Sequence, residues 1–147
     1  MKTLILKILE NIRCNRFIYY WLPAILCAGF IFYLSSLSHP NPPSFKNSDK
    51  VYHVITYSTL SFLFVRACQS QSALRTIILG LAACFLYGVS DEIHQIFVPP
   101  RTPDIFDVMA DTVGGIVGAI SFLTLKYVTR KIRHGNPDSH HQKMETL

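Results

Sequence analysis

Chemically active side chains gather at three places where an apolar segment meets a polar one. The three groups are Asp49, Lys50 and His53; Asp91, Glu92 and Gln95; and Arg101, Asp104, Asp107 and Asp111. Carboxyl and imidazole groups transfer protons near neutral pH, and arginine contacts carboxylate or phosphate through paired N–H donors. Carboxylate oxygens also suit Mg²⁺ or Ca²⁺, and an added histidine admits Zn²⁺. The residue types therefore allow acid–base chemistry, anion binding or a divalent cation, and they do not decide among these.

The pair Asp91 and Glu92 is the most informative of these groups. Both residues follow an apolar segment and are expected at the C-terminal end of a helix, which is the negative end of its dipole. Capping cannot explain acids there, so they need a cation, namely Arg101, a protonated His53 or His94, or a metal. Two neighbouring acids can also share one proton and act as acid and base.

Simpler explanations compete at the first group. Asp49 is expected to open a helix, where an acid is favoured whether or not it has a function. His53 and Tyr57 follow at helical spacing, so the three side chains form one stripe. A structural and a functional role for this stripe stay equally open.

The third group also contains residues with a simple structural explanation and residues without one. Asp104 precedes an apolar segment, and helix capping is its favoured role. Asp107 and Asp111 follow on one helix face, and an acid inside a membrane span is costly unless it faces other protein. Gly114 and Gly118 continue this face as a GxxxG pattern, which lets another helix approach closely. We therefore expect Asp107 and Asp111 to face the interior of a helix bundle.

Four apolar segments must position these groups. Residues 17–37 carry no charge and reach the roughly 20 residues that a membrane span needs. Residues 52–65, 76–89 and 112–128 are weaker segments, and the first two need polar extensions to span. Hydrophobic residues make up 50% of the chain and charged ones only 16%, against about 25% in soluble proteins. We predict an all-α, four-helix transmembrane bundle; a soluble bundle is disfavoured because residues 17–37 have no polar face.

The distribution of basic residues predicts the orientation. With four spans, eleven Lys and Arg fall at the two termini and the middle loop, and three fall on the other side. The eleven are Lys2, Lys7, Arg13, Arg16, Arg66, Arg75, Lys126, Arg130, Lys131, Arg133 and Lys143, and the three are Lys46, Lys50 and Arg101. The positive-inside rule places both termini in the cytoplasm and the acids at the outer membrane face. Topology and contacts with anionic lipids explain the basic clusters, so no nucleic-acid partner is expected.

This organisation predicts three regions along the chain. Residues 1–16 form a basic cytoplasmic N-terminus, residues 17–129 form the membrane domain, and residues 130–147 form a polar, disordered tail.

Three segments resemble the VanZ family of small bacterial membrane proteins. They are SDKVYH (48–53), YGVSDEIHQIFVPPR (87–101) and TPDIFDVMADTVGGIVGA (102–119). The shared motif positions are Asp49, Lys50, His53, Asp91, Glu92, Gln95, Arg101, Asp107, Asp111 and Gly114, and Asp111 stands where many members have Asn. The resemblance implies a multi-pass protein of the bacterial cytoplasmic membrane. The family's founding member is associated with reduced susceptibility to teicoplanin, a glycopeptide.

Three functional hypotheses follow, and whether the protein is an enzyme stays open. In the first, the outer site binds or acts on an envelope lipid or a lipid-linked cell-wall precursor. His53, Asp91, Glu92 and Asp107 would be catalytic, whereas Arg101, Gln95, Lys50, Asp49 and Asp111 would bind the ligand. In the second, the polar residues form a structural network in an assembly partner. The third is a proton-coupled transporter that uses Asp111.

Overall fold

Four helices make up the part of the chain that the computed structural model describes, which is residues 15–37, 48–99 and 101–134. The helices are α2 (Arg16–Ser35), α3 (Ser48–Cys68), α4 (Ala73–Gln95) and α5 (Ile105–His134), and these ranges contain no strand. The predicted all-α, four-helix bundle is confirmed. The expectations for residues 1–14, 38–47 and 135–147 lie outside the described residues. The last helix continues to His134, past the expected domain boundary at residue 129.

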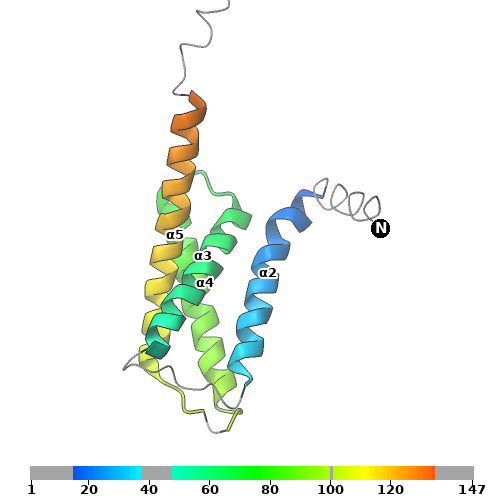
Figure 1. Cartoon of the computed structure of the whole chain (residues 1–147), viewed down its shortest axis with the longest axis vertical. Coiled ribbons are helices and arrows are strands. Elements are labelled where there is room, and N and C mark those ends of the chain that lie inside the picture. Colours follow the sequence, from blue (N-terminus) through cyan, green and yellow to red (C-terminus); the bar gives the residue numbers. More distant parts are fainter. Residues whose placement is uncertain (1–14, 38–47, 100, 135–147) are drawn as a thin grey trace, which may run out of the picture.

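The helices form an antiparallel bundle in which α5 packs most extensively against α3 and α4 (Figure 1). The helix α2 lies at the side and contacts mainly α3. The start of α2 and the end of α5 lie at the same end of the bundle, as an antiparallel order of four helices requires. We call this the basic end, and the opposite end, where α3 and α5 begin and α4 finishes, the acidic end.

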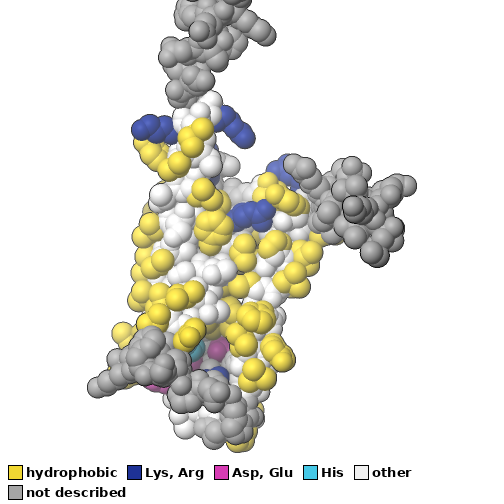
Figure 2. Space-filling view, in the orientation of Figure 1, with side chains coloured by type: hydrophobic (Ala, Val, Ile, Leu, Met, Phe, Trp, Pro, Cys, Tyr) yellow, Lys and Arg dark blue, Asp and Glu magenta, His cyan; other side chains and the backbone are white. Residues whose placement is uncertain are grey.

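Charge is segregated between these two ends. All six acids of the described residues lie at the acidic end: Asp49, Asp91, Glu92, Asp104, Asp107 and Asp111. Seven of the nine described Lys and Arg belong to the basic end: Arg16, Arg66, Arg75, Lys126, Arg130, Lys131 and Arg133. Figure 2 shows Asp, Glu and His side chains only at the end away from the projecting part of α5.

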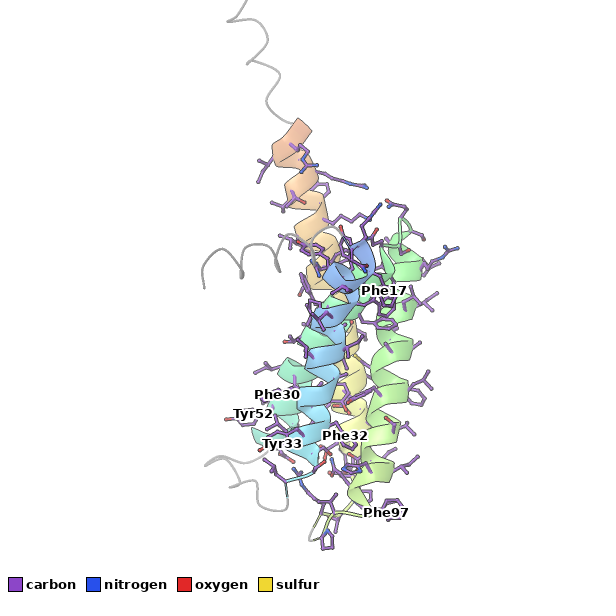
Figure 3. The ribbon with its side chains drawn as sticks, turned by 90° about the vertical axis from the view of Figure 1, so that its right-hand side faces the viewer. Phe17, Phe30, Phe32, Tyr33, Tyr52 and Phe97 are labelled. Atoms are coloured by element: carbon purple, nitrogen blue, oxygen red, sulfur yellow. The ribbon has the colours of Figure 1, made fainter. Side chains whose placement is uncertain are left out.

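Apolar side chains cover the sides of the bundle between the two ends (Figure 2). Phe30, Tyr33 and Tyr52 are exposed and point outward (Figure 3). Three helices, α2, α4 and α5, are long and apolar enough to cross a membrane. The helix α4 reaches a spanning length because it continues past Val89 to Gln95, through residues that are polar except for Ile93. The helix α3 falls short because it carries charged and hydroxyl side chains, several of which face the interior.

Small residues of α5 allow the close packing. A Cβ atom added at Gly114 would lie 2.8 Å from the carbonyl oxygen of Val54, and one added at Gly118 would collide with the carbonyl of Ser58. Both partners belong to α3, so the predicted close approach along this face is confirmed. Gly115 makes a similar approach to α4, which the sequence did not indicate.

Candidate functional site

Side chains from α3, α4, α5 and the loop before α5 meet at the acidic end. We define the polar cluster as Lys50, His53, Tyr57, Asp91, Glu92, Gln95, Asp104, Asp107 and Asp111. Asp91 lies close enough for its charge to act on His53, Tyr57 and Asp111. Eight of these nine residues were predicted as site or capping residues, and the antiparallel bundle brings them to one level.

A buried carboxylate holds a histidine at the centre of the cluster. Asp111 is completely buried, and its Oδ1 lies 2.8 Å from Nδ1 of His53. An ionised carboxylate can only accept, so Nδ1 donates and Nε2 stays available for proton transfer. Nε2 lies 3.9 Å from Asp107, too far for a hydrogen bond, and the ring stacks on Tyr57 with centroids 6.0 Å apart. The expected interior position of Asp107 and Asp111 is confirmed.

Room for Asp111 is provided by Gly88 on α4. A Cβ atom at Gly88 would lie 2.6 Å from Oδ2 of Asp111, which is inside van der Waals contact. This glycine therefore belongs to the site, although it carries no functional group. No local pattern in the sequence marks Gly88, because its importance depends on which residue of α5 lies opposite.

Lys50 ties the start of α3 to the start of α5. Its ammonium nitrogen lies 3.3 Å from Asp49 and 2.6 Å from Asp104, and it also contacts Asp107. The hydrogen bond from Lys50 holds the pKa of the Asp104 carboxyl below its usual value. Three carboxylates thus surround the ammonium group of Lys50, which the sequence suggested as a ligand-binding residue.

The two acids at the end of α4 have different partners. Gln95 Nε2 donates to Asp91 Oδ2 at 3.1 Å, one helical turn apart. Glu92 Oε2 accepts the backbone N–H of Asp104 at 2.7 Å, so it holds the loop that leads into α5. Asp104 in turn accepts the backbone N–H of Phe106 at 2.9 Å, which confirms its predicted capping role.

The expected pairing of Arg101 with Asp91 and Glu92 is not formed. Within the described ranges, Arg101 makes no ion pair. Its backbone N–H donates to the carbonyl of Val98 at 2.8 Å, and its side chain is half-buried. A second candidate cation, His94, contacts the hydroxyl of Ser36 at 2.9 Å and so faces α2. The third candidate, His53, lies within reach of the charge of Asp91.

Several buried polar atoms at this end lack a hydrogen-bond partner within the described part of the chain. They are Ser35 Oγ, Tyr57 OH, Glu92 Oε1, Arg101 Nε and Asp111 Oδ2. The side chains of Tyr57 and Asp111 lie close enough to interact with each other. Buried polar atoms of folded proteins are nearly always hydrogen-bonded, so the other three atoms favour a site that takes up water or a polar ligand. Tyr57 was recognised from its spacing to His53, but its hydroxyl was not assigned a role.

No group of three His, Cys, Asp or Glu among residues 15–37, 48–99 and 101–134 is placed to hold a metal ion. The six acids of this end face two described cations there, Lys50 and Arg101. An approaching ligand therefore meets an acid-rich interior, and Arg101 is the cation that lacks a carboxylate partner in the described ranges.

Comparison with known proteins places the chain in a family. The VanZ/LLP1 family model matches residues 17–126, which include all of α3 and α4 and most of α2 and α5. No curated protein and no solved structure matches the chain. The matched span is well over half of the sequence and contains the whole polar cluster. The chain is therefore a membrane protein of the VanZ/LLP1 family.

Proposed function

We propose that the acidic end binds a phosphate-bearing envelope lipid, such as a lipid-linked cell-wall precursor, and that His53 transfers a proton there. The single observation that carries this proposal is the contact between buried Asp111 and His53. A buried carboxylate that accepts from Nδ1 orients the imidazole and stabilises its protonated form, as in hydrolase triads. The side chain of His53 is 17% exposed, so part of the imidazole ring reaches the surface.

Arg101 is the proposed phosphate ligand. Arg101 is half-buried, its buried Nε has no partner in the described ranges, and the loop that carries it leads directly to the capping residue Asp104. Guanidinium and phosphate form paired, charge-assisted hydrogen bonds. Lys50 suits this role less, because three carboxylates already contact its ammonium group.

The proposed orientation follows the basic residues. Both termini would be cytoplasmic, and the polar cluster would face the outer leaflet of the bacterial cytoplasmic membrane. Enzyme-reporter fusions after Leu147 and at Asn41 test this arrangement. Activity of a periplasmic reporter at Leu147 would move the site to the inner leaflet.

The function is tested with matched variants and two readouts. Purified protein in detergent is mixed with undecaprenyl phosphate and examined by native mass spectrometry, and teicoplanin susceptibility is measured on expression. Arg101→Gln should weaken retention of the lipid about tenfold, the usual loss for a charge-assisted contact. His53→Gln should keep the lipid and lose the cellular effect. His94→Gln, which changes a histidine of the same end that faces α2, is the control.

Two outcomes would reject this function. The first is a parent protein that retains no more undecaprenyl phosphate than a neutral phospholipid. The second is a cellular effect that survives both His53→Gln and Asp111→Asn at normal protein levels.

A structural role for the cluster is the second candidate. The contacts of Lys50 with three acids and of Glu92 with the backbone of Asp104 favour it, because they join α3, α4 and α5. Under this alternative the protein is an assembly partner. Loss of the cellular effect would then always accompany loss of folded protein, and His53→Gln would lower protein levels.

A further inference from the structure

A cleft of about 450 Å³ opens at the basic end, on the opposite side of the molecule from the polar cluster. Side chains of α2, α3 and α5 line it, including Tyr20, Phe62, Arg66, Phe122, Leu125 and Lys126. Its walls therefore combine aromatic rings with two cations. The proposed function uses none of these residues.

Arg66 is held in place by aromatic rings. Its guanidinium carbon lies 4.9 Å from the ring centre of Tyr19 and 5.0 Å from that of Tyr20. Within the described ranges it makes no ion pair. A guanidinium group that lies over a ring keeps its N–H donors in its own plane, where they remain available to an anion.

Lys126 supplies a second cation from α5. Its ammonium nitrogen donates to the carbonyl oxygen of Ser70 at 2.8 Å, which uses one of three donors. Arg16 and Arg130 contact Gln69 and Gln71 at the same rim, at 3.3 and 3.4 Å. Because every described acid lies at the other end, nothing in the described ranges neutralises this positive field.

The floor of the cleft is apolar. Phe62 and Phe122 meet edge to face, with ring centres 5.7 Å apart, and Leu125 lies beside them. A free anion such as inorganic phosphate makes no favourable contact with these apolar side chains. A phospholipid can contact both the cations and the apolar side chains, because its phosphate is anionic and its acyl chains are apolar.

We propose that this cleft is a binding site for an anionic phospholipid, with the phosphodiester on Arg66 and Lys126 and an acyl chain along Phe62 and Phe122. The lipid comes from the membrane leaflet at the basic end. This inference is independent of the function proposed for the acidic end.

The protein contains its own probe for this site. Trp21 is the one tryptophan of the sequence, and its ring centre lies 5.7 Å from that of Phe64 on α3. The full chain is reconstituted in phosphatidylcholine vesicles that contain increasing fractions of brominated phosphatidylglycerol or of brominated phosphatidylcholine. Trp21 adjoins Tyr20, which lines the cleft, so quenching of Trp21 reports the lipid at this end of the bundle. The apparent affinity for phosphatidylglycerol should exceed that for phosphatidylcholine by at least about fivefold, the effect of one cation near anionic lipid.

Two double variants distinguish binding at the cleft from attraction of anionic lipid by the overall positive charge of the basic end. Arg66→Gln with Lys126→Gln should reduce the preference for phosphatidylglycerol to near one. Arg75→Gln with Arg133→Gln removes the same charge from exposed positions outside the cleft and should retain it. Equal quenching by both lipids in the parent would overturn the proposal, and this comparison does not depend on the folding of any variant. A preference that survives the first double variant, or disappears equally in both, would also overturn it.

A final arm distinguishes a lipid from a free anion. Millimolar inorganic phosphate is added at constant ionic strength, and the preference of the parent for phosphatidylglycerol should persist. If inorganic phosphate abolishes the preference, the site takes a free phosphate and the lipid proposal is wrong.

Discussion

Replacing Gly118 by alanine tests the packing of α5 against α3. The added Cβ would lie 2.8 Å from Cβ of Ser61 and 2.9 Å from the backbone nitrogen of Phe62, and it would collide with the carbonyl of Ser58. Two of these three atoms are backbone atoms, which cannot rotate away. Carbon atoms pack at about 3.5–4 Å, so the two helices must separate by roughly 1 Å.

The expected cost follows from two opposing terms. Overpacking of a tight interface destabilises by about 1–3 kcal/mol, and the backbone neighbours of Gly118 favour the upper part of this range. Alanine in place of glycine stabilises a helix by about 0.8–1 kcal/mol. Gly118→Ala should therefore lower the free energy of unfolding by about 1–2 kcal/mol.

Gly29 is the matched control for this change. It also lies within a helix, α2, but a Cβ added there meets no atom within 4 Å. Only the helix-propensity term applies, so Gly29→Ala should leave stability unchanged or raise it by up to about 1 kcal/mol. Unfolding of both variants and the parent is measured by denaturant titration in one detergent, with helix content followed by circular dichroism.

The comparison gives a clear refutation. If Gly118→Ala is as stable as Gly29→Ala, α5 does not approach α3 at this level, and the register of the two helices described here is wrong. A loss of stability in both variants would instead indicate a general intolerance of the bundle to alanine and would equally reject the argument.

Three further predictions concern the polar cluster. Lys50→Gln should lower the free energy of unfolding by about 1–3 kcal/mol in the same titration, because it leaves the carboxylate of Asp107 without its charged partner. The pKa of Asp104 is lowered from 3.8 in the folded protein, so its ionised carboxylate stabilises the fold fully at pH values above 3.8. The parent should therefore lose stability as the pH falls below 3.8. This loss should be smaller in Lys50→Gln, which lacks the hydrogen bond that lowers the pKa. Asp91→Asn and Glu92→Gln should keep normal protein levels in the membrane, because amide oxygens still accept the observed hydrogen bonds. If these acids belong to a site, the same variants should lose the proposed effect on teicoplanin susceptibility.

The sequence was sufficient for the fold because membrane spans are set by length and apolarity. A charge-free run marked α2, and the polar residues that flank the weaker segments became the ends of α3, α4 and α5. Antiparallel crossing then brings alternate helix ends together, which is why the acids could be expected at one level. Their burial followed from the cost of an acid in a span, and Asp111 is completely buried.

The partners of each charge could not be predicted in the same way. Arg101 was expected to neutralise Asp91 and Glu92, whereas Lys50 is the cation that gathers carboxylates. This choice depends on the rotation and register of α3 against α5. Rotation and register depend on which residues of α3 pack closely against Gly118 and its neighbours. The periodicity of the sequence does not show which residues these are.

Packing and site chemistry meet at Gly114, and this coupling gives the last prediction. A Cβ atom at Gly114 would lie 2.8 Å from the carbonyl of Val54, which follows His53 directly, and 3.0 Å from Cβ of Tyr57, one turn further along α3. Gly114→Ala should therefore push α3 away from α5 at the level of His53. This movement should lengthen the 2.8 Å contact between His53 and Asp111.

Gly118→Ala displaces α3 one turn further from this contact, so it serves as the control for Gly114→Ala. Gly118→Ala should be destabilised at least as much as Gly114→Ala, since the Cβ added at Gly118 makes the shorter contacts with α3. Only Gly114→Ala should lose the cellular effect at matched levels of folded protein, because proton transfer depends on the orientation of His53, and a misplacement of about 1 Å costs roughly a hundredfold in rate. If the two variants lose the effect in proportion to their stability alone, the contact of His53 with Asp111 is structural, and the second candidate function is the correct one.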